Sequence, residues 1–491
     1  MRTEDTGFFG HPRGLSTLFF TEMWERFSYY GMRALLILFM TAAPAAGGLG
    51  FDTVTAGAIY GLYTSMVYLT TLPGGWIADR LIGPQNAVLY GGVLIAAGHF
   101  SMAVPSLATF YLGLFLIVIG TGLLKGNVSV IVGRLYAPED VRRDAGYSIF
   151  YMGINLGAFI APLVCGYLGQ RVSWHLGFGA AGVGMTLGLL QYVLGRRHLG
   201  DAGRHPADAG SPEALARQKR WAAVWTGIAA AVLVAGGCGI YTGAIPLNPT
   251  QISDAAGYLL LGVTVAFFGW ILLGPGWTPE ERRRLYVIAV LFVAAALFWS
   301  MFEQAGTTLN LFADRNTDTS IAGWEFPSTW FQSLNSLFII TLAPVFAWLW
   351  VWLASRGREP SSPAKFGLGL VLVAAGFAVL AVGAVLAERG IEVSPMWLAV
   401  TYLLHTLGEL ALSPVGLSAM SKLAPVRIGG LIMGAWFLAA AVGNYIGGRM
   451  AGLYGSMTLP SLFGSVAAFG VACGLLLLLF ARPMRRLAAE R

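Results

Sequence analysis

The stretch TEMWERFSYYGMRALL, Thr21 to Leu36, lies within an apolar segment that runs from about Leu15 to Ala43. About 20 apolar residues are enough to cross the hydrocarbon core of a bilayer, so the segment predicts a membrane-spanning helix. It is too long and too charged for the apolar core of a signal peptide. We therefore expect it to stay in the mature protein as the first span.

The composition also favours a membrane location, because the chain is more apolar and less charged than a soluble domain. Of its 491 residues, 56% are hydrophobic and 11% are charged, and the mean hydropathy is +0.67. Cys165, Cys238 and Cys473 lie far apart in apolar runs, a spacing that indicates neither a metal site nor a disulfide framework. No glycine-rich run has the spacing of a phosphate-binding loop, so no ATPase is indicated.

The apolar segments form a block of six, a pair and a second block of six, fourteen predicted spans in all. The first block lies near 15–43, 54–77, 85–105, 107–132, 145–168 and 174–194, the pair near 221–241 and 255–273, and the second block near 285–304, 329–353, 364–387, 395–420, 428–449 and 459–481. Residues 195–220 are rich in Arg, Asp, Ala, Gly and Pro and have no apolar period. They predict a solvent-exposed linker.

The basic residues indicate how the chain crosses the membrane, because cytoplasmic loops retain Lys and Arg. Most of the 31 Lys and Arg residues fall at the termini and in every second loop. Those on or near the other side are Arg171, Arg315, Arg389 and Arg449. The net charge of +7 therefore indicates orientation and not nucleic-acid binding. We expect both termini in the cytoplasm and a multi-pass protein of the cell (inner) membrane.

This layout predicts an all-α polytopic membrane protein with the major-facilitator fold, in which two six-helix bundles surround a midplane site. The expected parts are an N-terminal bundle, a cytoplasmic linker, two inserted transmembrane helices and a C-terminal bundle, at residues 1–194, 195–220, 221–273 and 274–491. The loop GGWIADRLIG supports this fold through Gly75, Asp79, Arg80 and Gly83. The alternative is that this loop is merely a polar turn.

A polar stripe runs along the first span. Glu22, Glu25, Arg26, Tyr29 and Arg33 occur at relative positions 0, 3, 4, 7 and 11, so at about 100° per residue they share one helix face. A charge at the bilayer centre costs about 2.5–3.5 kcal/mol on insertion scales, so this face must look toward the protein interior. Glu22 and Arg26 can pair along the helix, whereas Arg33 needs a carboxylate from another helix.

Two acids of the second block, Glu303 and Glu409, are candidates for that carboxylate, and Lys125 is the remaining deep cation of the first block. Four carboxylates then face three cations, so one acid can take up a proton. A pairing that breaks and re-forms suits proton coupling, because burial favours a protonated carboxyl and a nearby Arg opposes it. The alternative is a set of static salt bridges. His99 and His405 are lesser candidates for proton relays.

Two motifs resemble those of the proton-dependent oligopeptide transporter family, a branch of the major facilitators. Its ExxER segment is matched in the first span by Glu22, Glu25, Arg26, Phe27, Tyr29, Tyr30 and Gly31. Its fifth-helix motif is matched in FYMGINLGA by Phe150, Tyr151, Ile154, Asn155 and Gly157, although Ala158 stands where Ser is common. The two inserted helices resemble those of prokaryotic members, and the likeness covers most of the chain.

The resemblance implies a role for particular residues. Arg33 and Lys125 would hold the peptide carboxylate, and its amino terminus would be received by Asn155, Asn335 and Glu409. The pocket would be lined by Tyr29, Tyr30, Tyr68, Tyr151, Trp299, Ser413 and Trp436. The proton would be handled by Glu22, Glu25, Arg26 and Glu303. Two salt bridges would close alternate faces, Arg33 with Glu303 and Lys125 with Glu409.

The chemistry of short peptides agrees with these roles. A short peptide is a zwitterion of fixed backbone length, so a cationic and an anionic pole recognise its ends while aromatic walls accept varied side chains. We therefore expect a proton-coupled symporter of di- and tripeptides that works by alternating access and is not an enzyme. Its partners would be short peptides, protons and the lipid bilayer, without nucleic acid, metal or cofactor, and we expect a monomer.

Two other readings of the sequence remain. A proton-coupled major-facilitator carrier of another small solute or drug would need the acids, but a carrier of cationic drugs would not need Arg33 and Lys125. A receptor or an enzyme is less favoured, because the chain shows no appended soluble domain, metal cluster or nucleophile-base pairing.

Overall fold

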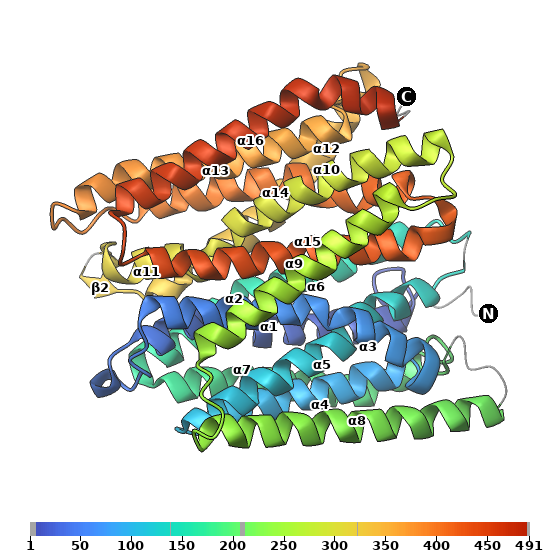
Figure 1. The fold of residues 1–491 in the computed structure, drawn as a ribbon, viewed down its shortest axis with the longest axis horizontal. Coiled ribbons are helices and arrows are strands. Elements are labelled where there is room, and N and C mark those ends of the chain that lie inside the picture. The colour runs from blue at the N-terminus through green and yellow to red at the C-terminus, as the bar shows by residue number, and fades with distance from the viewer. Residues whose placement is uncertain (1–5, 138, 207–211, 322, 489–491) are drawn as a thin grey trace. The chain divides into compact units, whose positions relative to one another are not determined.

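Figure 1 shows the computed structural model, which describes residues 6–137, 139–206, 212–321 and 323–488 and consists almost entirely of helices. Its helices are α1 (Arg13–Thr41), α2 (Thr53–Leu69), α3 (Thr71–Ile77), α4 (Pro84–Met102), α5 (Leu107–Arg134), α6 (Arg143–Tyr167), α7 (Trp174–Gly195), α8 (Pro212–Tyr241), α9 (Pro249–Leu273), α10 (Pro279–Phe302), α11 (Thr308–Arg315), α12 (Ser333–Ser355), α13 (Ser362–Ala387), α14 (Met396–Leu423), α15 (Gly429–Met450) and α16 (Leu459–Ala488). The two strands, β1 (Ser320–Ile321) and β2 (Trp324–Glu325), form an antiparallel hairpin.

Each of the fourteen predicted spans contains one main helix. The two additional helices are short: α3 follows α2 within the second predicted span, and α11 follows α10 after the 3-10 turn Glu303–Gly306. Among the described residues, ten helices are long and apolar enough to cross a membrane by length and composition. α1 is not one of the ten, because it carries the charged stripe that the sequence places in the first span.

The contacts between residues divide the chain into two compact units, which we describe separately. Unit 1 comprises residues 1–28, 70–157 and 181–255, and unit 2 comprises residues 29–69, 158–180 and 256–491. α1 therefore contributes its first part to unit 1 and, from Tyr29 onward, its second part to unit 2. The predicted division into two bundles, a linker and two inserted helices stays a prediction.

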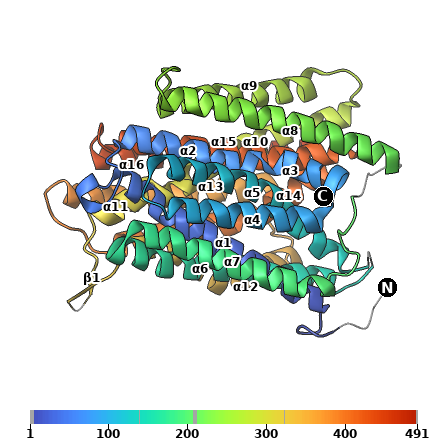
Figure 2. The same ribbon diagram turned by 90° about the horizontal axis from the view of Figure 1, so that it is seen from below.

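Unit 1 combines an apolar core with a close contact between α4 and α5, which Figure 2 shows side by side. Leu18, Leu124 and Met185 are completely buried in this core. A Cβ atom added to Gly91 would lie 2.5 Å from the carbonyl oxygen of Gly120, and one added to Gly120 would lie 2.6 Å from that of Gly91. Small residues let membrane helices approach this closely.

The first part of the predicted linker packs against the start of α4. Leu199 is buried, and Gln85 Nε2 donates hydrogen bonds to the carbonyl oxygens of Gly200 and Ala202, at 3.1 and 2.9 Å. The backbone N–H of Gln85 also donates to the carbonyl oxygen of Gly203 at 2.9 Å. Most of the described residues from 196 to 206 are nevertheless exposed, so the linker stays a prediction. The contact of Leu199 was not foreseen, because a single apolar residue and backbone hydrogen bonds leave no periodic pattern. Residues 207–211 lie outside the described part.

In unit 2, α13 and α16 run side by side, and α2 packs against α15. A Cβ atom on Gly61 of α2 would lie 2.8 Å from the carbonyl oxygen of Tyr445 and 3.3 Å from the Cα atom of Gly448. The backbones of α2 and α15 therefore touch almost directly. This contact fixes the position of the neighbouring residue, Tyr60.

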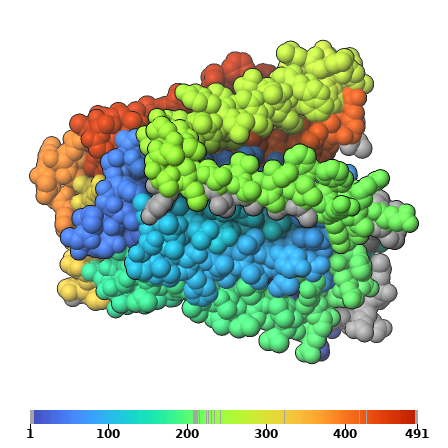
Figure 3. Space-filling view, turned by 60° about the horizontal axis from the view of Figure 1, so that its bottom comes forward, coloured from blue at the N-terminus to red at the C-terminus, as the bar shows by residue number. Residues whose placement is uncertain are grey.

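The second inserted helix, α9, has an apolar surface. Tyr258, Leu259 and Val265 are exposed, and Figure 3 shows the helix in yellow-green on the visible face. A helix that faces lipid needs large apolar side chains on its outer surface, and α9 has them.

The close contact between α4 and α5 predicts that one added methyl group lowers the stability of the protein. In Gly120→Ala, the new Cβ would meet backbone atoms of α4, so we expect the helices to separate at a cost of about 1–3 kcal/mol. The apparent melting temperature of the purified protein in detergent measures this loss. Gly126→Ala is the matched control, because it lies in the same helix and its Cβ would meet no atom within 4 Å. Equal melting temperatures for the two variants would contradict the close contact.

Candidate functional site

In unit 1, the acids of the first span surround Arg26. Arg26 Nε lies 2.6 Å from Glu25 Oε2 and 3.0 Å from Glu22 Oε1, and all three side chains are almost completely buried. The helix spacing brings Glu22 one turn before Arg26, as the sequence predicts. Two carboxylates therefore share one guanidinium, which leaves excess negative charge in a buried place.

The other unit 1 candidates come from α5 and α6. Lys125 of α5 lies within electrostatic reach of Glu22. Asn155 of α6 is buried and donates from Nδ2 to the carbonyl oxygen of Tyr151 at 3.0 Å, while the Tyr151 ring is exposed. The roles that the resemblance implies for these residues stay predictions.

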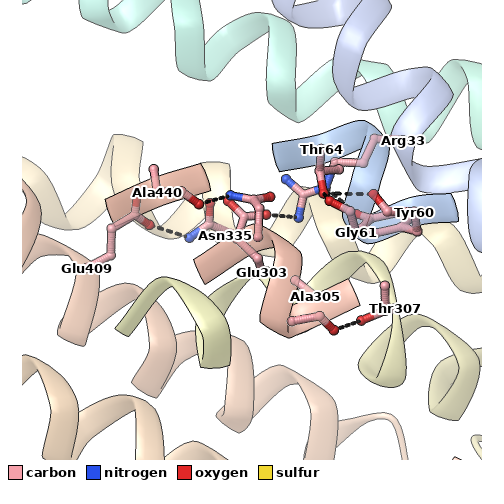
Figure 4. A network of polar contacts seen from close by, with 12 residues as sticks. Arg33, Tyr60, Gly61, Thr64, Glu303, Ala305, Thr307, Asn335, Glu409 and Ala440 are labelled. Atoms are coloured by element: carbon pink, nitrogen blue, oxygen red, sulfur yellow. Dashed lines mark hydrogen bonds and ion pairs between the residues drawn. The ribbon is translucent and has the colours of Figure 1, made fainter. Parts of the chain in front are cut away.

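In unit 2, Arg33 of α1 meets Glu303, as Figure 4 shows. Arg33 Nη2 lies 2.8 Å from Glu303 Oε2, and both side chains are almost completely buried. Arg33 Nε donates a hydrogen bond of 2.8 Å to the hydroxyl of Tyr60 in α2. The cation that lacked a partner in its own helix therefore lies against one of the two acids proposed for it.

An interruption of the helix after Phe302 places Glu303 beside Arg33. α10 ends at Phe302, the 3-10 turn begins with Glu303, and Thr307 then has φ −127° and ψ −95°, which is not helical. The next helix, α11, is tied to α1 because Asn310 Nδ2 donates to the carbonyl oxygen of Ala34 at 2.8 Å. Interrupted helices of this kind commonly form the binding sites of membrane transporters.

Aromatic rings surround the Arg33 end of the site. The rings of Tyr29 and Tyr30 meet edge to face, with their centroids 5.2 Å apart, and the Arg33 guanidinium carbon lies 5.5 Å from the centre of the Tyr30 ring. Tyr68 of α2 lies within electrostatic reach of Tyr29. Three of the four tyrosines named from the sequence are thus neighbours of Arg33 or of one another.

The second acid, Glu409 of α14, pairs with an amide in unit 2. Asn335 Nδ2 donates hydrogen bonds to Glu409 Oε2 at 2.9 Å and to Thr406 Oγ1 at 3.0 Å. Asn335 and Glu409 were both assigned to the peptide amino terminus, and the structure brings them into direct contact. An amide that donates to a carboxylate fixes the direction in which the free lone pairs of that carboxylate point.

Three further pocket candidates also belong to unit 2. Trp299 lies against Phe298 and Phe302, with ring centroids 5.4 and 5.5 Å apart. Trp436 is mostly buried and lies directly over Gly416, where a Cβ atom would overlap its ring. Ser413 lies one turn after Glu409 and is half-buried.

Other predicted features have different outcomes. The pairing of Lys125 with Glu409 joins residues of different units and stays a prediction. His99 and His405 are completely buried, and His405 packs against the ring of Phe377 at 5.0 Å. Among the described residues, no group of three or more His, Cys, Asp and Glu side chains could hold a metal ion.

Sequence reasoning missed Tyr60 and the break after Phe302. Tyr60 is one of three tyrosines in the α2 sequence AIYGLYTSMVYL, and only the partner of a hydroxyl distinguishes one buried tyrosine from another. The count of buried cations also omitted Lys365, which is 5% exposed. Its Nζ lies 2.5 Å from Glu359 Oε1 and 4.4 Å from the centre of the Trp350 ring. Lys365 lies at the start of α13, where sequence alone does not indicate burial.

Comparison with known proteins identifies relatives of the whole chain. A family model described as "PTR2: POT family" matches residues 85–465. The "Peptide transporter YePEPT" of Yersinia enterocolitica subsp. palearctica serotype O:3 (strain YE-P4) is 45% identical over 491 residues, which cover 98% of this chain and 96% of that protein. A "Di-/tripeptide transporter" of Lactococcus lactis subsp. cremoris is 38% identical over 498 residues, which cover 100% and 99%.

Solved structures agree in fold. The crystal structure of a peptide transporter POT in complex with sulfate has a TM-score of 0.92 and 45% identity, and covers 98% of this chain and 96% of its own. A POT family transporter in complex with 5-aminolevulinic acid has a TM-score of 0.89 and 37% identity, with 98% of each chain covered.

These matches confirm the predicted fold class, an all-α multi-pass membrane protein with the major-facilitator fold and additional helices. They also confirm the family resemblance drawn from the motifs in the first span and in α6, and the prediction that the protein is a transporter and not an enzyme. The chain belongs to the POT family.

Proposed function

We propose that this protein carries di- and tripeptides into the cell together with protons, by alternating access of its binding site to the two sides of the membrane. The names of the Yersinia and Lactococcus relatives support peptides as the substrate class. The observation that carries the proton-coupled mechanism is the buried contact between Arg33 and Glu303, at 2.8 Å.

The coupling step follows from the chemistry of that contact. While Glu303 is ionised, it holds the Arg33 guanidinium, which can then offer less of its charge to a peptide carboxylate. When Glu303 takes up a proton, its attraction for Arg33 falls and the guanidinium is released to the substrate. A proton on Glu303 and a peptide carboxylate therefore both favour the state in which Arg33 is separated from Glu303. Each promotes the binding of the other.

The other pole of the peptide would be received by Glu409. Asn335 occupies one oxygen of this carboxylate, and the remaining lone pairs can accept from an ammonium group. A zwitterionic dipeptide that enters with one proton carries one net positive charge inward. The membrane potential then contributes about 2.3 kcal/mol per 100 mV to accumulation. We further propose that the protein is a monomer in the cell (inner) membrane with both termini in the cytoplasm.

A second candidate function is transport of another amino acid-like solute. It is favoured by the related POT family structure that contains 5-aminolevulinic acid, a molecule with amino and carboxyl ends. Arg33 and Glu409 offer opposite charges to such ends irrespective of a peptide bond between them. Competition of 5-aminolevulinic acid with dialanine for uptake distinguishes a shared site from strict peptide selectivity.

Proton-driven uptake is the direct test of the proposed function. Purified protein in sealed vesicles should accumulate labelled dialanine when the outside is acidic, because inward proton flow supplies the free energy. A protonophore should reduce the accumulation to simple equilibration. Uptake that is indifferent to the protonophore would exclude proton coupling.

Substitution of Glu303 and substitution of Glu409 should impair transport in different ways. Glu303→Gln mimics a permanently protonated acid, so we expect gradient-driven accumulation to be lost while gradient-free exchange of dialanine between the two sides continues. Glu409→Gln removes the negative pole for the peptide amino terminus, so both activities should fall by about tenfold or more, the loss typical of a buried charged contact. Counterflow and gradient-driven uptake, measured on the same vesicles, separate these outcomes. Identical behaviour of the two variants would show that the assigned roles are wrong.

Arg33 discriminates between peptide transport and transport of cationic drugs. We expect Arg33→Gln to abolish dialanine uptake, because Glu303 loses its partner and the peptide carboxylate loses a donor. A carrier of cationic solutes would keep its transport in this variant. Uptake of dialanine and of a lipophilic cation, measured for the wild type and for the variant, distinguishes the two kinds of carrier.

A further inference from the structure

Tyr60 is hydrogen-bonded to the Arg33 guanidinium. Its side chain is completely buried, and its hydroxyl accepts a well-aligned hydrogen bond of 2.8 Å from Arg33 Nε. The contact between Arg33 Nη2 and Glu303 Oε2 is equally short, but among the described residues this oxygen accepts no aligned hydrogen bond. The directional bond to the guanidinium is therefore that of the tyrosine, while the acid contributes charge.

The surroundings hold Tyr60 in this position. A Cβ atom on Gly306 would overlap the Tyr60 hydroxyl and would lie 3.0 Å from Arg33 Nε. On the other side, the next residue, Gly61, presses α2 against the backbone of α15. The hydroxyl is thus enclosed between Arg33 and the turn that follows Glu303, as Figure 4 shows for the arginine side.

We propose that Tyr60 is a positioning residue for proton coupling, whose hydroxyl occupies Arg33 Nε and so limits Glu303 to a contact that a proton can release. This proposal rests on the proposed function and names a residue that lies outside the two motifs in the first span and in α6. Guanidinium and carboxylate groups otherwise form a two-point grip, in which Nε and one Nη donate in parallel to the two oxygens. Tyr60 withholds one of these two donors from Glu303.

Other titratable groups also act on this pair, and all of them remain in a variant that lacks only the Tyr60 hydroxyl. Tyr29 and Tyr30 act on Arg33 from α1, and Tyr402 acts on it from α14. Glu409, also in α14, acts on Glu303 as a like charge. Tyr402 donates to the carbonyl oxygen of Ala305 at 3.4 Å. Because Glu303 Oε2 already lies 2.8 Å from Nη2 of the same guanidinium, we expect the Glu303 carboxylate to accept from the Nε–H group that the variant would free.

The test is the pH dependence of dialanine uptake by Tyr60→Phe. Without the hydroxyl, Glu303 should accept from both Nε and Nη2, its ionised form should be held more tightly, and more acid should be needed to protonate it. We expect the external pH of half-maximal uptake to fall by about one unit, which is a tenfold change in proton affinity. At saturating acidity, the KM for dialanine should stay within about twofold of the wild-type value.

Two further variants separate positioning from loss of structure. Tyr192→Phe is the matched control, because it removes another buried tyrosine hydroxyl, which donates to the carbonyl oxygen of Gln85 at 2.8 Å in unit 1. We expect its pH profile to be that of the wild type. Gly306→Ala should displace the Tyr60 hydroxyl and reproduce the acid shift. The double variant with Tyr60→Phe should then shift no further than either single variant, because both act on one hydrogen bond.

The outcomes are distinct for the two proposals. If the wild-type protein does not accumulate dialanine on a proton gradient, the proposed function fails. If the wild type does accumulate it and Tyr60→Phe keeps the wild-type pH profile or shifts it to higher pH, the role of Tyr60 fails alone. An acid shift in Tyr192→Phe of the same size would also overturn it, because the effect would then follow from any lost buried hydroxyl.

Discussion

The structure depends on how a buried guanidinium is neutralised within a membrane protein. An unpaired charge inside a membrane costs several kcal/mol. The acids on the helix face of Arg33, Glu25 and Glu22, already lie against Arg26. The charge of Arg33 is met instead by Glu303, which lies far away in sequence. The fold of unit 2 is therefore constrained to bring α1 and the end of α10 together.

Glycines allow the backbone approach that this meeting requires. Gly306 gives the turn after Glu303 room beside the Tyr60 hydroxyl, and Gly61 lets α2 lie directly on α15 at Gly448. These residues carry no charge, yet a methyl group at any of them would push against the polar cluster or the helices that hold it. In a membrane, where burial of apolar groups does little to join helices, close packing of this kind supplies the attraction.

The sequence predicted those parts of the protein that follow from regular helix geometry or from the cost of charge in lipid. The helices in the fourteen predicted segments, the shared face of Glu22 and Arg26, and the need of Arg33 for a distant acid are of this kind. Tyr60, the break after Phe302 and the packing of Leu199 could not be predicted in the same way. They depend on which groups the tertiary structure brings into contact. The sequence around a tyrosine or a leucine in an apolar segment does not indicate which group its side chain contacts.

A buried ion pair is a poor source of stability, because the cost of removing two charges from water offsets much of their attraction. That near balance is what a switch needs. A pair that was far more stable than its separated groups would hold Arg33 permanently, and one that was far less stable would not form in the membrane interior. In the mechanism that we propose, addition of one proton to Glu303 removes the charge of one partner and reverses the balance. In the same proposal, the single-point contact between Arg33 and Glu303, with Tyr60 on the Nε donor, would keep the ion pair weak enough for one proton to release it.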